Sequence, residues 1–287
     1  MKIPFIKAHG ARNDFLLSWR DQLPPELSGD RKLSDFAAAA RAICERNTGA
    51  GADGWLLISR SKTADDATSA GGSFDVAIEL WNSDGSRSEI SGNGTRCAAA
   101  VLVDAGHTRS DVRIATGAGI KCLRLLDRQK CKFSFEMNMG SPHIEELHTD
   151  VEGHDATILN VGNPQCVFFV DHFDFDWASL GARVERLPRF PNRTNVSFVR
   201  ILDGHTIEAR FFERGAGVTM SSGTGSTGAA AAARARGLVE SPVCVQTPAG
   251  PLHLRWDGPE VRCGDGPEIL LAGPAEIVAR GEFYWEG

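Results

Sequence analysis

The stretch SGNGTRCAAAV, residues 91–101, returns as SGTGSTGAAAA at residues 222–232, an offset of 131 positions. The same offset relates VRIATGAGIKCLRL, which starts at position 112, to VCVQTPAGPLHLRW, which starts at position 243. An offset close to half of the 287-residue length indicates two similar domains and not a solenoid of short repeats. The chain is therefore expected to be an internal duplication.

Each copy shows the same local pattern, in which a β-rich run is followed by a glycine-rich turn, an alanine-rich helix and another strand. FDVAIELWN (74–82) comes before the first turn, and TIEARFFE (206–213) comes before the second. Each helix is expected to follow a serine N-cap and to end at Gly106 or Gly237. With further strand-like segments such as GWLLIS (54–59), the pattern predicts an α+β fold of two pseudo-twofold-related domains.

The repeat also sets the expected domain boundaries. We expect an N-terminal half at residues 1–128, completed by a C-terminal strand at 272–287, and a C-terminal half at 129–271. SDFAAAARAICERNTG (34–49) is a separate amphipathic helix that is expected to end at Gly49.

Composition limits the classes of partner. The formal net charge is −6 and the basic residues are scattered, so a small-molecule ligand is expected and nucleic acid is not. The first residues lack the apolar core of a signal peptide and no run of about 18 apolar residues occurs, so we expect a cytoplasmic location and no membrane contact. The seven cysteines form no Cys-x-x-Cys motif, so no metal site is predicted.

The two glycine-rich helix starts are candidates for ligand binding. A helix N-terminus presents unpaired N–H groups and the positive end of the helix dipole, which suit a carboxylate or a phosphate. If Ser91 and Ser222 approach a common cleft, they can serve opposite faces of one carbon atom. For a single copy, a serine N-cap beside a tight turn is ordinary helix architecture, but its duplication favours a functional role. Neither copy has the spacing of a phosphate loop or of a dinucleotide-binding turn.

Six motifs taken together give the chain a family resemblance over essentially its whole length. They are HGARNDFLL, NTGAGADGWLLI, WNSDGSRSEISGNGTRC, VGNPQCVFFV, FPNRTNVSFV and FFERGAGVTMSSGTGS. In this order they resemble diaminopimelate epimerases, cofactor-independent racemases of the same broad fold as proline racemases and phenazine-biosynthesis isomerases. The resemblance implies a strongly curved β-sheet around a central helix in each domain, an active site between the domains, an amino-acid substrate, no cofactor and a homodimer.

The resemblance also implies a set of site residues. Ser91 and Ser222 match the two catalytic cysteines of the family, one of which takes the α-proton while the other returns a proton to the opposite face. Glu213 matches a residue beside the reacting α-amino group. The substrate-binding positions are Asn13, Asn82, Gly92, Asn93, Asn163, Asn195, Glu213, Arg214, Gly223 and Thr224. Among these, Gly92-Asn93 and Gly223-Thr224 would offer helix-start N–H groups to the α-carboxylate.

Serine at both catalytic positions changes the expected chemistry. The pKa of a free thiol is about 8.5, whereas the pKa of an alkyl hydroxyl is close to that of bulk water, about seven units higher. Forming an alkoxide therefore costs about 9–10 kcal/mol more than forming a thiolate, which is more than one helix dipole supplies. Ordinary two-thiol epimerisation is not expected from Ser91 and Ser222.

The chain departs from the family at four further positions. Gln165 stands where the family has a histidine, Val218 where it has a glutamate, and Arg12 where it has a glycine. Gly54 replaces a substrate-binding glutamine of some members. Gln165 and Val218 favour natural divergence over deliberate replacement of the two thiols.

Individually, several of these residues also fit structural roles. Asn82 and Asn163 are typical turn formers, and Glu213 can be a carboxylate at the end of a strand. However, Glu213 lies nine residues before Ser222 and Asn82 lies nine before Ser91, so the repeat places them at equivalent positions. Cys97 is interpreted as a buried packing residue and not as a nucleophile.

Three functions are therefore compatible with the sequence. The first is a diaminopimelate epimerase-like isomerase acting at the α-carbon, as in lysine biosynthesis, with both thiols replaced. The second is a diverged isomerase or dehydratase that uses Glu213 as its general base. The third is a non-catalytic protein that binds an amino acid.

Overall fold

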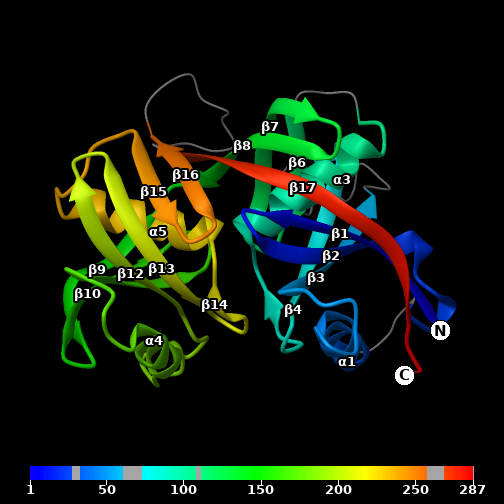
Figure 1. Cartoon of the computed structure of the whole chain (residues 1–287), viewed down its shortest axis with the longest axis horizontal. Coiled ribbons are helices and arrows are strands. Elements are labelled where there is room, and N and C mark those ends of the chain that lie inside the picture. The colour runs from blue at the N-terminus through cyan, green and yellow to red at the C-terminus, as the bar shows by residue number, and fades with distance from the viewer. Residues whose placement is uncertain (28–32, 61–72, 108–110, 257–267, 287) are drawn as a thin grey trace. The chain divides into compact units, whose positions relative to one another are not determined.

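The structure is a computed structural model. It describes residues 1–27, 33–60, 73–107, 111–256 and 268–286. The chain forms two compact units (Figure 1). Unit 1 consists of Met1–Phe135 and Pro274–Gly287, and unit 2 consists of Glu136–Gly273.

The described residues of unit 1 include the α-helices α1 (Leu33–Cys44) and α3 (Gly92–Asp104) and short 3₁₀ turns at Arg20–Gln22 and Pro25–Leu27. Its strands are β1 (Lys2–Gly10), β2 (Asn13–Trp19), β3 (Gly54–Arg60), β4 (Val76–Asn82), β5 (Arg87–Ser88), β6 (Asp111–Thr116) and β7 (Gly119–Gln129). The helix expected at 34–49 ends earlier, at Cys44.

Unit 2 contains α4 (Trp177–Glu185) and α5 (Gly223–Ala235). Its strands are β9 (His143–Val151), β10 (His154–Asn160), β11 (Pro164–Phe169), β12 (Asn195–Asp203), β13 (Thr206–Glu213), β14 (Gly217–Thr219), β15 (Val243–Thr247) and β16 (Gly250–Arg255). Two strands, β8 (Lys132–Gly140) and β17 (Ile269–Tyr284), contribute residues to both units.

The two units share one strand topology, which confirms the predicted two-domain repeat. In unit 1, β1–β2 is antiparallel, β2–β3 parallel, β3–β4 antiparallel, β4–β6 parallel and β6–β7 antiparallel. In unit 2, the pairs β10–β11, β11–β12, β12–β13, β13–β15 and β15–β16 alternate in the same way. Parallel neighbours need a crossover connection, and each one here contains a helix. The helices of the parallel crossovers are α1 and α3 in unit 1 and α4 and α5 in unit 2.

A central helix lies among the strands of each unit, as the α+β prediction required. Helix α3 contacts β1, β2, β3 and β6, and α5 contacts β9 to β13, β15 and β16 (Figure 1). Both helices have 13 residues, and nearly all of them are buried. Their alanines and glycines keep the helices narrow enough to be enclosed by a curved sheet at normal packing density.

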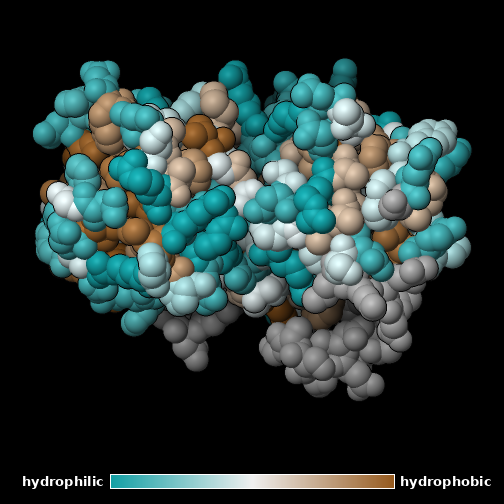
Figure 2. Space-filling view, turned by 90° about the horizontal axis from the view of Figure 1, so that it is seen from below, coloured by the Kyte–Doolittle hydropathy of each residue, from teal (hydrophilic) through white to brown (hydrophobic). Residues whose placement is uncertain are grey.

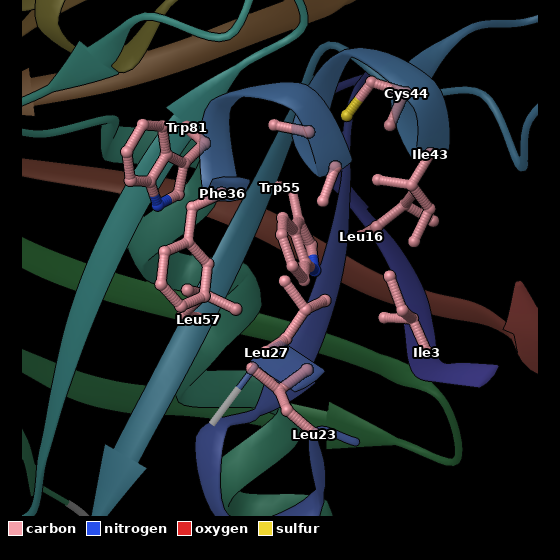
Figure 3. Close-up of a cluster of buried hydrophobic side chains, with 13 residues drawn as sticks. Ile3, Leu16, Leu23, Leu27, Phe36, Ile43, Cys44, Trp55, Leu57 and Trp81 are labelled. Atoms are coloured by element: carbon pink, nitrogen blue, oxygen red, sulfur yellow. The ribbon is translucent and has the colours of Figure 1, made fainter. Parts of the chain in front are cut away.

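The outer helices cover a second hydrophobic layer. In unit 1, Phe36 of α1 packs against Trp55 and Trp81, with the Phe36 and Trp81 rings stacked at 6.0 Å (Figure 3). In unit 2, Leu180 and Val184 of α4 belong to a cluster that includes stacked phenylalanines from β11 and β12. These layers fix α1 and α4 on their sheets.

The face of the molecule shown in Figure 2 is mostly hydrophilic, with hydrophobic side chains in smaller patches. Within the described ranges, no helix combines the length and the apolar character needed to span a bilayer.

Candidate active site

The start of α5 is built around Ser222, which is 1% exposed. Its backbone is extended, and its Oγ accepts a 2.9 Å hydrogen bond from the Gly225 amide, as an N-cap does. A Cβ on residue 225 would lie 2.9 Å from this Oγ and 2.7 Å from Phe211 Cδ1. Glycine at position 225 therefore permits the close approach of the Ser222 hydroxyl to the helix.

The Ser222 hydroxyl also binds the Glu213 side chain. The Ser222 Oγ donates a 2.8 Å hydrogen bond to Glu213 Oε2, while Thr219 Oγ1 donates a 2.7 Å hydrogen bond to Glu213 Oε1. Strand β14 pairs antiparallel with the end of β13, which brings Thr219 back beside this carboxylate. Two hydroxyls thus hold the carboxylate in one orientation at the start of α5.

The start of α3 in unit 1 repeats the cap but not the carboxylate. Ser91 Oγ accepts from the Gly94 amide at 3.1 Å, and Ser91 has no carboxylate hydrogen-bond partner in the described part of the chain. Asn82, at the position equivalent to Glu213, donates to Ser86 Oγ at 3.0 Å. The two repeats therefore differ at the residue nine positions before each capping serine.

Asn13 and Asn93 are joined in unit 1. Asn93 Nδ2 donates to Asn13 Oδ1 at 3.2 Å, and Asn13 Nδ2 donates to Asp53 Oδ2 at 2.7 Å. The fully buried Arg96 donates to Asn93 Oδ1 and, through Nε, to the Pro274 carbonyl at 3.1 Å. Burial lowers the pKa of Arg96 to about 10. The side-chain amides of Asn13 and Asn93 are thus oriented by the charged side chains of Asp53 and Arg96.

Asn163 is held in unit 2 by Gln165. The fully buried Gln165 donates from Nε2 to Asn163 Oδ1 at 2.6 Å, and Asn163 Nδ2 donates to Thr224 Oγ1 at 3.4 Å. A Cβ at position 228 would lie 3.1 Å from the Gln165 side chain, so Gly228 leaves room for it beside α5. The Gln165 side chain is a neutral amide and does not change its charge near neutral pH, whereas a histidine at this position could.

Asn195 connects a strand start to the turn after β13. Its Oδ1 accepts from the Arg214 amide at 3.0 Å, and its Nδ2 donates to the Pro164 carbonyl at 3.0 Å. The guanidinium of Arg214 donates to the Asn192 carbonyl at 2.9 Å. Both the main chain and the side chain of Arg214 are therefore anchored to the segment around Asn195.

Strand topology explains why these residues gather. In unit 2, Gln165 pairs with Asn195 across the parallel strands β11 and β12, so both strands start at the same end of the sheet. Strand β13 is antiparallel to β12, so Glu213 at the end of β13 also lies at this end of the sheet. In unit 1, Gly54 at the start of β3 pairs with Asn82 at the end of the antiparallel strand β4. The structure places the candidates in two clusters, one per unit. Unit 1 holds Asn13, Asn82, Ser91, Gly92 and Asn93, and unit 2 holds Asn163, Asn195, Glu213, Arg214, Ser222, Gly223 and Thr224.

Arg12 and Val218, two positions expected to differ from the family, have distinctive surroundings. Ala11 and Arg12 form the two-residue turn between β1 and β2, with φ of +49° and +62°. Positive φ at both positions favours glycine, so Arg12 adopts a conformation that is unfavourable for its side chain. Val218 of β14 is 52% exposed, so its apolar side chain faces solvent.

Several supporting residues were not predicted from the sequence, among them Arg96, which contacts Asn93. Asp53 orients Asn13, Thr219 orients Glu213, and Glu185 accepts a hydrogen bond from the Gly215 amide. Asp53 and Thr219 lie inside the quoted motifs, but their roles depend on strand pairing. For Glu185, the available signal was the pattern of Asp176 followed by Leu180 and Val184, which is an N-cap with helical spacing.

Cys97 is unsuited to nucleophilic chemistry. It is fully buried in α3, and burial raises the pKa of its thiol to about 12. No group of three or more His, Cys, Asp or Glu side chains among the described residues is arranged to hold a metal ion.

The family model described as diaminopimelate epimerase matches residues 5–145 and 157–277. Diaminopimelate epimerase of Pelotomaculum thermopropionicum is 34% identical, covering 97% of this chain and 98% of the relative. Diaminopimelate epimerase of Moorella thermoacetica is 32% identical, with the same coverage.

Among solved structures, a hydroxyproline epimerase from Agrobacterium vitis has a TM-score of 0.73 at 15% identity, over 98% of this chain and 92% of that one. A phenazine biosynthesis protein of the PhzF family from Bacillus anthracis has a TM-score of 0.65 at 13% identity, over 98% and 99%. These structures share the fold.

Proposed function

Because the chain belongs to the diaminopimelate epimerase family, we propose that it binds diaminopimelate or a closely similar amino acid and removes and returns the proton at the α-carbon, which is the first half of isomerisation. Relatives that carry this name match nearly the whole chain, which supports a substrate of this class. The proposed binding residues lie in both units.

The start of α5 supplies the proposed α-carboxylate site. The amides of Gly223 and Thr224 are in the first turn, where helix geometry provides no carbonyl partner, and the helix dipole adds positive potential. Arg214 is the proposed partner of the distal carboxylate, because a guanidinium can bind a carboxylate with two parallel hydrogen bonds.

The observation that carries the proposal is the 2.8 Å hydrogen bond from Ser222 to Glu213. Since a serine hydroxyl is too weak an acid to replace a thiol, we assign the base role to the Glu213 carboxylate. Glu213 takes the proton from Cα, and the electron pair left on carbon is delocalised into the substrate carboxylate. The amides at the start of α5 stabilise that charge. Return of the proton by Glu213 to the same face exchanges it without inverting the carbon.

One observation favours the third function compatible with the sequence, a binding protein without catalysis. Both oxygens of Glu213 already accept hydrogen bonds, one from Thr219 and one from Ser222. A base in this position must give up part of this bonding as it takes a proton, because a protonated oxygen no longer accepts in the same way.

Deuterium exchange separates the two functions. The chain is incubated in D₂O with meso- and LL-diaminopimelate, and Cα deuteration is followed by NMR while binding is measured by calorimetry. We expect binding and Cα exchange, with Glu213→Gln lowering the exchange rate by about 10²- to 10⁴-fold. Binding without exchange would establish the non-catalytic function. Absence of binding to either isomer would contradict both.

A further inference from the structure

Glu185, the last residue of α4, is a buried carboxylate that the proposed chemistry does not use. Its side chain is 2% exposed. A carboxylate removed from water is unfavourable unless charges and hydrogen bonds compensate it. Its partners therefore show what the residue holds in place.

The partners of Glu185 lie in two segments that follow α4 in the chain. Its Oε1 accepts a 3.0 Å hydrogen bond from the Gly215 amide and another from the Arg193 guanidinium. Its main-chain carbonyl accepts from the Thr194 amide at 3.2 Å. Arg186 also contacts Oε2 at 3.3 Å, but its side chain is 74% exposed, so this ion pair is weak.

These contacts are made by residues adjacent in sequence to Asn195 and Arg214, two of the proposed binding residues. Arg193 and Thr194 come directly before Asn195, and Gly215 comes directly after Arg214. The Arg214 amide is itself bound by Asn195 Oδ1 at 3.0 Å. Two consecutive amides, those of residues 214 and 215, are thus held by side chains from different segments, and Glu185 links both segments to the end of α4.

We propose that Glu185 is a positioning residue that determines specificity by fixing the turn that carries Arg214. This inference rests on the proposed function, in which Arg214 binds the distal carboxylate of the substrate. Loss of the Glu185 carboxylate removes an acceptor from the Gly215 amide and from the Arg193 guanidinium. The segments that carry the remaining anchors of Arg214, which are Asn195 Oδ1 and the Asn192 carbonyl, are then held less firmly, and the position of the Arg214 guanidinium is less well defined. Recognition of an amino acid that has a distal carboxylate should suffer, and recognition of one that lacks it should not.

The experiment compares meso-diaminopimelate with L-lysine, which lacks the distal carboxylate. We expect Glu185→Ala to weaken diaminopimelate binding about tenfold in calorimetry and to change lysine binding by less than about twofold. Glu185→Gln keeps an acceptor for the Gly215 amide and should recover part of the loss. In an Arg214→Ala background, Glu185→Ala should cause no further loss of diaminopimelate affinity.

Asp176→Ala is the matched control. Asp176 caps the other end of α4 by accepting from the Ser179 amide at 3.0 Å, so its loss loosens the same helix without touching the turn. This variant should lower Tm and leave the ratio of the two affinities unchanged. Equal weakening of both ligands by Glu185→Ala, or additive losses with Arg214→Ala, would overturn the proposal.

Amide hydrogen exchange of the ligand-free chain tests the positioning role independently of any ligand. We expect the Gly215 amide to exchange about tenfold faster or more in Glu185→Ala, and at the original rate in Asp176→Ala. Unchanged protection of this amide would refute the positioning role. A chain that binds neither amino acid would instead refute the proposed function, and with it the specificity role.

Discussion

The Ser222 hydroxyl donates to the Glu213 carboxylate at 2.8 Å, whereas Ser91, the matching serine of unit 1, has no carboxylate partner among the residues described. In unit 1 the position of Glu213 is taken by Asn82, which donates to Ser86. Both units thus have a helix that starts at a capping serine, but only Ser222 also donates to a carboxylate. The two serines should respond differently to the same substitution.

Replacing each serine by alanine measures this difference. Ser91→Ala removes an N-cap and should lower the free energy of unfolding by about 1 kcal/mol. Ser222→Ala removes a cap and also the hydrogen bond to Glu213, so we expect a loss of about 2 kcal/mol. Urea denaturation followed by tryptophan fluorescence provides both values, and each variant serves as the control for the other. Equal losses would mean that the bond to Glu213 contributes nothing to stability.

Arg12→Gly should stabilise the chain by about 0.5–1 kcal/mol, because Arg12 lies in a two-residue hairpin turn at φ +62°. Glycine adopts this conformation without the Cβ penalty, which exceeds the extra entropy that glycine loses on folding. Thermal unfolding by calorimetry provides the measurement. Arg12→Ala is the control, since alanine keeps the penalty and should bring no gain. A stabilisation by alanine as large as that by glycine would assign the effect to the arginine side chain instead.

Much of the fold was predictable because the duplication repeats local signals. The serine caps, the glycines at helix ends and the alternating strands occur twice, so each copy supports the other. Ser91 and Ser222 are N-caps, as predicted. The helices end two residues before Gly106 and Gly237, and both glycines have positive φ. Helix α4 was not predicted, because its nine residues give a short apolar pattern and its partner helix α1 has an unrelated sequence.

The site was less predictable, because its supporting contacts are made across the sheet. Asn13 and Asn93 could be proposed as site residues from their motifs, but their mutual hydrogen bond joins positions 80 residues apart. The contact between Gln165 and Asn163 is local in sequence and still required the strand geometry to recognise it. Sequence patterns thus identify candidate site residues, whereas strand pairing determines which of these residues contact one another.

The buried cysteines should resist alkylation at pH 8. Burial raises the pKa of Cys44, Cys97 and Cys166 to about 12, so only about one thiol in 10⁴ is ionised at that pH, and the side chains are also shielded from reagent. Cys131 is exposed and should react first with iodoacetamide. Peptide mass spectrometry assigns the labelled sites. Labelling of all four positions in urea is the control, and rapid labelling of Cys97 in the folded chain would show that α3 opens.

Introducing a thiol at both serine positions should produce epimerisation. Ser91→Cys and Ser222→Cys each place a thiol at a helix N-terminus, where the dipole favours the thiolate. Inversion of the α-carbon needs a base on one face and an acid on the other. Ser222→Cys alone leaves the Ser91 side without a proton carrier, so it should at most exchange deuterium without inverting. Ser91→Cys adds a thiol that can work with Glu213 and should invert slowly, and the double variant should interconvert LL- and meso-diaminopimelate much faster than either. Chiral chromatography of the products, with the double alanine variant as the inactive control, measures the rates. Fast epimerisation by the unaltered chain would contradict this reasoning, because it would show that Ser91 and Ser222 are not what limits inversion and that a second group besides Glu213 already delivers the proton.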